Sequence, residues 1–221
     1  MSQLNLALRL LAQGEFVCQH RYAGAFEGLS SADGRKRAED WLSTMGYRLA
    51  QLDSNGAFFM AYAQPDQDTR NRLRDELGLL RDKLYPAVTF LETIRQAQAG
   101  AGHLQAGDPV SASEIIEAVR TSTVLERRLE QLKDLRGARL DEKSADRVDR
   151  ILKWLKDDGY LYLTNEDLRI YTVTGKISYL YGLLAFMQDH TPLMNESEVD
   201  DALDDNKQMP LGAGADGIAE A

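Results

Sequence analysis

Apolar and polar residues over the first sixty positions follow the period of a helix and then that of a strand. The leucines of "LNLALRLLAQ" share one face of a helix that Gly14 ends, "EFVCQ" is a short strand candidate, and "RYAGAFEGL" is a weak helix. A stronger helix pattern begins near Ser31 and stops at Gly46. Its apolar positions, spaced as on one helix face, are Ala38, Trp41, Leu42 and Met45.

The next stretch predicts a β-hairpin. "YRLAQL" and "AFFMAY" are strand-like, and the residues 53–56 between them, "DSNG", are a strong turn signal. Phe58, Met60 and Tyr62 alternate onto one face of the second strand. Residues 4–63 therefore run helix, short strand, helix, helix, hairpin, which is the order of a winged helix, a version of the helix-turn-helix.

A helical connector follows the hairpin. Residues 66–84 predict a charged amphipathic helix whose apolar stripe is Leu73, Leu77, Leu80 and Leu84. Pro86 is tolerated in the first turn of a helix, so a second helix is expected over roughly 86–98. Residues 99–109, "AGAGHLQAGDP", read as a surface loop.

The pattern of the first sixty residues then recurs. Two helices are predicted by capping-box patterns, in which Ser111 pairs with Glu114 and Thr123 with Glu126. A loop at "RGARLDEKS" then leads to another helix, which Gly159 ends. That helix carries Val148, Ile151, Leu152 and Leu155 on one face. "YLYL" and "LRIYTV" are strands around the turn "TNED".

A short motif marks the same place in both repeats. Trp41-Leu42, three residues and Gly46-Tyr47 reappear as Trp154-Leu155, three residues and Gly159-Tyr160, and these are the two tryptophans of the chain. Both tryptophans lie on the apolar stripe of their helix, which favours a position in each core over a role as partner-binding anchor.

These patterns predict a mainly α fold with small β-hairpins, of the α+β class, in which tandem winged-helix domains are joined by a helical connector. The expected domain boundaries are residues 1–65 for the N-terminal winged helix, 66–105 for the connector and loop, 106–190 for the C-terminal winged helix, and 191–221 for a tail.

Charge is unevenly distributed along the 221 residues. The net charge is −9, but residues 195–221 hold eight acids and only Lys207, so the rest of the chain is nearly neutral. Residues 191–221 also contain few large apolar side chains, which predicts an acidic, disordered tail. Its role is open between keeping the protein soluble and binding a basic surface.

Residues suited to catalysis or metal binding are sparse. His20, His103 and His190 lie far apart without partners at metal-ligand spacing, and the single Cys18 lies in an apolar run. "TGKIS" at 174–178 is similar to the end of a phosphate-binding loop but lacks its first glycine. We therefore expect neither an enzyme nor a cofactor. No run reaches the roughly 20 apolar residues of a membrane span and no signal peptide is evident, so we expect a cytoplasmic protein.

Basic residues recur on the helix before each hairpin, where a winged helix meets DNA phosphates. Acids such as Glu39, Asp40, Asp146 and Asp149 are interleaved with them, so a solvated face remains the alternative. The near-neutral charge argues against strong, sequence-specific DNA binding by the isolated chain. The DNA-contact candidates are Arg35, Lys36, Arg37, Arg147, Arg150 and Lys153.

The last predicted helix, 177–187, is apolar on most sides. Core packing is the default explanation, but part of such a helix also suits an interface with a second subunit or a partner helix. The interface candidates are Ile177, Leu180, Tyr181 and Leu184.

The architecture and the stretches "AEDWLSTMGY", "LRDKLYPAVTFLE" and "VDRILKWLKDDGYL" resemble the MukE/MksE family, the kleisin-interacting tandem winged-helix subunits of bacterial condensins. The resemblance spans roughly residues 4–190, is closer to MksE, and rests on no catalytic motif. It implies a non-enzymatic, nucleoid-associated homodimer that binds an MksF-like kleisin and, through it, regulates an MksB-like SMC ATPase. It also implies weak, non-specific DNA contact, in chromosome organisation and segregation or in plasmid defence.

Two other functions remain open at this stage. A transcription regulator with two DNA-reading heads has the same modules but requires sequence-specific, strongly salt-dependent binding by the isolated protein. An enzyme of unrecognised type requires a pocket with convergent polar groups.

Overall fold

The computed structural model describes residues 2–53, 56–98, 103–130, 132 and 143–190, and for 72–86 and 187–190 it describes the backbone alone. The predicted stripe from Leu73 to Leu84, the loop at 136–142 and the acidic tail therefore lie outside the described side chains or residues. The described part is mainly helical with small antiparallel sheets, which confirms the α+β class. Within it, no helix is both long and apolar enough to span a bilayer.

The first half contains the predicted elements in the predicted order. They are α1 (Gln3–Ala12), α2 (Gln19–Ser30), α3 (Ala32–Ser43), β1 (Tyr47–Gln51) and β2 (Phe58–Tyr62). The strand expected at "EFVCQ" is a single bridge in which Val17 pairs with Phe58. The Ser31 hydroxyl caps α3 by accepting a hydrogen bond from the Gly34 amide at 3.0 Å.

Apolar faces of these helices and of the hairpin form one core. β1 and β2 pair antiparallel with Leu49 opposite Met60. Leu11, Leu29, Leu42 and Phe58 are at most 1% exposed and pack together in this core. The 3.6-residue spacing of the helices and the two-residue spacing of the hairpin thus converge on a single cluster.

The connector differs from the prediction of two helices. α4 (Gln67–Ala97) is one continuous helix through Pro86. An internal proline removes one helical hydrogen bond, at a cost of about 3 kcal/mol. The turns that follow offset this loss because Ala87, Phe90 and Ile94 are buried in the core of the second half.

The second half contains β3 (Pro109–Ser111), α5 (Ala112–Thr121), α6 (Thr123–Glu130), α7 (Ser144–Asp157), β4 (Leu161–Asn165), β5 (Ile170–Val173) and α8 (Lys176–His190). The three strands have the order β3-β5-β4. β3 was not predicted, since it is short and falls at the end of a loop rich in glycine and alanine. Ser111 caps α5 as expected, but Ser122 rather than Thr123 accepts the hydrogen bond that caps α6.

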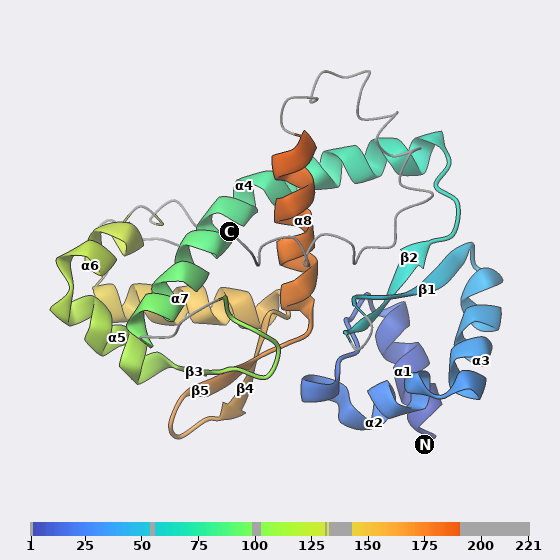
Figure 1. Cartoon of the computed structure of the whole chain (residues 1–221), viewed down its shortest axis with the longest axis horizontal. Helices are drawn as coiled ribbons and strands as arrows, with labels where there is room; N and C mark the ends of the chain where they lie inside the picture. Colours follow the sequence, from blue (N-terminus) through green and yellow to red (C-terminus); the bar gives the residue numbers. More distant parts are fainter. Residues whose placement is uncertain (1, 54–55, 99–102, 131, 133–142, 191–221) are drawn as a thin grey trace, which may run out of the picture.

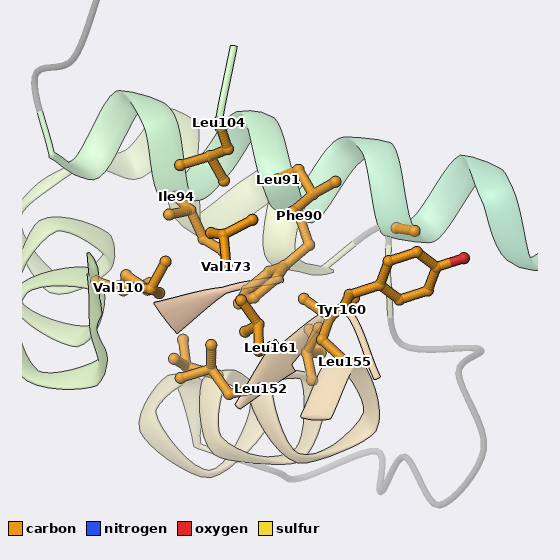
Figure 2. Packing of buried hydrophobic residues seen from close by; sticks show 14 of the residues in the cluster. Phe90, Leu91, Ile94, Leu104, Val110, Leu152, Leu155, Tyr160, Leu161 and Val173 are labelled. Atoms are coloured by element: carbon orange, nitrogen blue, oxygen red, sulfur yellow. The ribbon is translucent and has the colours of Figure 1, made fainter. Parts of the chain in front are cut away.

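Figure 2 shows the core of the second half, in which residues from α4, α7 and all three strands meet. Phe90 and Ile94 of α4 are fully buried, as are Leu152 and Leu155 of α7. The C-terminal part of α4 thus occupies the position in the second half that α1 occupies in the first half. Likewise β3 pairs with β5 as Val17 pairs with Phe58. Apart from the additional α6, both halves have the order helix, short strand, helix, helix, hairpin.

Figure 1 shows α4 running from the first half to the second, and α8 standing between them. In this view the outer end of α8 crosses α4, whereas its first turns lie near the hairpin of the first half, where Tyr179 contacts Phe59. The two halves are thus connected twice, by the α4 chain segment and by packing against α8.

Candidate functional site

The basic cluster on α3 is exposed, as a DNA-contacting helix requires. A side chain at Gly34 would overlap the carbonyl oxygen of Gly28, so this glycine allows α3 to begin against the end of α2. Arg35, Lys36 and Arg37 follow in the next turn and all are exposed. The Arg35 guanidinium lies 5.1 Å from the centre of the Phe58 ring, and Arg37 approaches Asp33 at 3.8 Å. Exposed pairs of this kind are weak, so the charges remain available to an anion.

The basic residues of α7 are less uniformly exposed. Arg147 is buried, with 8% of its surface exposed, because it lies on the same turns as the core residue Val148. Lys153 is exposed and Arg150 is half-buried, so Arg147 is the least accessible of the three. Of the six DNA-contact candidates, Arg147 is the one whose burial argues against direct phosphate contact.

The second hairpin carries an acidic tip. Glu166, Asp167 and Leu168 are exposed there, and Leu168 has 61% of its surface in solvent. Arg169, in the left-handed region at φ 53°, forms an ion pair with Asp149 of α7, so its charge is already matched. Acids at this tip disfavour an approach of phosphates along the hairpin.

The four interface candidates on α8 lie in the core of the second half or pack against it. Ile177 and Leu180 are at most 1% exposed and belong to the second core, against which Leu184 packs. The Tyr181 hydroxyl donates a hydrogen bond to the Leu104 carbonyl at 3.1 Å, and burial raises the pKa of Tyr181. Tyr181 and Leu184 are half-buried, so part of each side chain is also open to solvent.

An aromatic cluster at the opposite face of α8 joins the two halves. The rings of Phe16 and Phe59 are stacked with centroids 5.1 Å apart, and Tyr179 of α8 lies 5.2 Å from the first ring and 5.8 Å from the second. Beneath them, the backbone at Gly175 lies so close to Cys18 and Ala57 that an added Cβ would lie 2.8 and 3.0 Å from their Cβ atoms. We call these six residues the junction.

A lysine completes this junction. Lys176 Nζ donates a hydrogen bond to the Asp158 carbonyl at 2.6 Å and lies 4.9 Å from the Tyr160 ring centre and 5.4 Å from that of Phe16. Sequence reasoning missed the junction, but a signal was present. Ala57, Phe59 and Ala61 make the second face of β2 apolar as well, which is typical of a strand covered on both sides.

The two repeated tryptophans lie at the edges of their cores rather than inside them. Trp41 and Trp154 are both half-buried. Trp154 packs against the second core, and Trp41 packs against the first while also lining an open hollow of about 300 Å³ between α1 and α3. The other lining residues are Asn5, Leu8, Arg9 and Ala12.

Groups suited to catalysis are not gathered in the described part of the chain. There, no three histidine, cysteine or acidic side chains lie close enough to hold a metal ion. Burial, with a smaller effect of Asp158, raises the pKa of Tyr160 to about 12, which makes it a poor acid. His20 lies against Gly107 and His103 against Tyr181, while the side chain of His190 is outside the described set.

Comparison with protein families assigns most of the chain. A family model described as condensin complex protein MksE matches residues 2–182. The match covers α1 to the middle of α8 and so includes both halves and the junction. Among curated proteins, none matches the chain significantly.

Proposed function

Because the chain belongs to the family of the condensin complex protein MksE, we propose that it is a non-enzymatic regulatory subunit of an SMC-type complex. In this proposal it binds an MksF-like kleisin as a homodimer, and through the kleisin it acts on an MksB-like SMC ATPase. ATP is hydrolysed by the ATPase, and this chain contributes binding surface. It then works in the cytoplasm at the nucleoid, in chromosome organisation and segregation or in plasmid defence.

We further propose that both halves are winged-helix domains. The recurrence of helix, short strand, helix, helix and hairpin supports this assignment, as does the matching strand pairing in the two sheets. The domain boundaries are then 1–65, 66–105, 106–190 and 191–221, with one adjustment. The turns of α4 from Ala87 onward belong with the second domain, since Ala87, Phe90 and Ile94 are buried in its core.

The proposed DNA contact is weak and non-specific and centres on α3. Arg35, Lys36 and Arg37 are exposed on the helix that precedes the first hairpin, and Arg150 and Lys153 add a smaller set on α7. Acids are interleaved on both helices, so neither provides a strongly positive surface by itself. Tight binding would instead require DNA held inside the assembled complex, where several such surfaces act together.

Co-purification tests the proposal of a condensin subunit. The full chain, expressed with an MksF-like kleisin and an MksB-like SMC ATPase from the same source, is expected to elute with both on size-exclusion chromatography. Elution alone, under conditions in which the kleisin and ATPase assemble, would contradict it. Tight binding by the isolated protein to one genomic fragment over random DNA would favour the transcription regulator instead.

Charge reversal tests the DNA surface. The double variant Lys36→Glu and Arg37→Glu is expected to weaken DNA binding by the assembled complex and to reduce the slope of log K against log salt by about 2. The matched control reverses Arg120 and Arg127, which are exposed on α5 and α6. Equal losses in both variants would show a general charge effect and would remove α3 as the contact surface.

A further inference from the structure

The hollow beside Trp41 combines an apolar floor with a basic rim. Asn5, Leu8, Arg9 and Ala12 of α1 are spaced i, i+3, i+4, i+7 and so form one helix face toward it. Trp41 of α3 is flanked by Arg37, one turn earlier on the same helix, and by Met45, which lies two residues beyond the end of α3 and is 45% exposed. A half-exposed tryptophan next to a leucine is a typical anchor point for a partner segment. The arginines favour a segment that is acidic.

The chain itself contains such a segment. Residues 196–205, "ESEVDDALDD", include six acids and no base. Val199, Ala202 and Leu203 are spaced i, i+3, i+4, so in a helix they would share one face while the acids flank it. Ser197 followed by Asp200 is a favourable helix start. This segment lies beyond residue 182, where the family match ends, and follows the described part of the chain.

The position of α8 favours a second copy as the source of the segment. α8 leaves the first half at the junction, and its 15 residues extend about 22 Å toward α4, away from α1 and α3 (Figure 1). Only five residues separate His190 from Glu196, so the two residues lie at most about 22 Å apart. The segment therefore begins within this reach of the end of α8 that points away from α1 and α3. A second copy is free of this limit.

We propose that residues 196–205 of one chain dock as a short amphipathic helix in the hollow between α1 and α3 of a second copy. Val199 and Leu203 contact Trp41 and Leu8, and the acids lie beside Arg9 and Arg37. This inference is independent of the proposed condensin role.

Tryptophan fluorescence tests the docking, since the chain has two tryptophans. The reporter is the full chain carrying Trp154→Phe, so that Trp41 alone is observed, with Val199→Ser and Leu203→Ser to disable its own tail. The donor is the full chain carrying Trp41→Phe and Trp154→Phe with the native tail. Adding donor to reporter is expected to change the Trp41 emission in a saturable manner.

Two controls separate apolar docking from charge attraction. The first control is a donor that also carries Val199→Ser and Leu203→Ser and keeps all six acids. It buries two fewer apolar side chains, so it is expected to bind the reporter at least about tenfold more weakly. Arg9→Glu in the reporter is expected to weaken binding, whereas Arg120→Glu is expected to leave it unchanged. Far-UV circular dichroism checks that each variant is folded.

Three results would overturn the proposal. One is an unchanged Trp41 emission at all donor concentrations. Another is an equal response to the native and the serine-substituted donor, which would show charge attraction alone. The third is a difference in Trp41 emission, without donor and at every protein concentration, between the reporter and the same chain with its native Val199 and Leu203, which would show docking within one chain.

Discussion

At Gly175, a single residue without a side chain sets the distance between the two halves. An alanine there would place its Cβ 2.8 Å from the Cβ of Cys18, a distance that backbone shifts must relieve. Gly175→Ala is therefore expected to lower the free energy of unfolding by about 1–3 kcal/mol. Chemical denaturation followed by circular dichroism measures it.

Gly182, within α8, provides the control for Gly175, which directly precedes this helix. Among the described residues, nothing lies within 4 Å of a Cβ added at this position. Gly182→Ala is expected to raise the free energy of unfolding by about 0.5–1 kcal/mol, because alanine restricts the unfolded chain more than glycine does. If both variants shift stability equally, close packing is not the reason for a glycine at 175.

Tyr160, which contacts the junction through Lys176, is expected to make the free energy of unfolding depend on pH. Burial is the main cause that raises its pKa from 10.0 to about 12. The neutral phenol is thus favoured in the folded state, so this contribution to stability is complete below pH 10 and is lost as the pH rises from 10 to 12. The slope is at most about 1.4 kcal/mol per pH unit.

Tyr160→Phe isolates this contribution. The variant cannot ionise at this position, so its free energy of unfolding is expected to fall less steeply than that of the unmodified protein between pH 10 and 12. Denaturant titrations at intervals across this range give both slopes. Parallel curves would show that Tyr160 ionises as readily in the folded chain as in the unfolded one.

At the scale of elements, the two faces of β2 pack against different parts of the protein. Phe59 faces Tyr179 of α8, whereas Met60 packs against the core of the first half. Phe59→Ala is expected to speed hydrogen exchange in the first turns of α8, and Met60→Ala to speed it in α1 and α3. Because Phe59 is only half-buried, its loss costs less than the roughly 3–5 kcal/mol of a fully buried phenylalanine. Identical exchange patterns would contradict a separate junction.

The sequence predicts elements well where one local period dominates. The buried residues Val148, Ile151 and Leu155 of α7 were expected from spacing alone, and Gly46 and Gly159 end their helices with φ near 80°. Continuity through Pro86 and the three-residue strand β3 depend instead on contacts distant in sequence. The same holds for the candidate residues: spacing placed Arg147 among the exposed bases, but the fold buries it. A wide apolar face on α8 likewise could not reveal whether the protein itself or a partner covers it.

At the scale of the whole molecule, charge divides the chain into a nearly neutral body and an acidic end. Removing residues 191–221 deletes eight acids and Lys207, which changes the net charge from −9 to −2. Less repulsion between protein and phosphates then favours non-specific DNA binding by the body. The deletion leaves every described element intact, because the last of them, α8, ends at His190.

The tail-deleted chain is therefore expected to bind random-sequence DNA more tightly than the full chain at low ionic strength. The difference should shrink as salt rises, since the Debye length falls from about 30 Å at 0.01 M to about 3 Å at 1 M. Fluorescence anisotropy of labelled duplex DNA across this salt range measures both affinities. A full chain with its six acids at 196–205 changed to amides separates charge from chain length, and it should behave as the deletion does. If the amide variant matches the unmodified chain instead, the tail opposes DNA by occupying space and not by its charge.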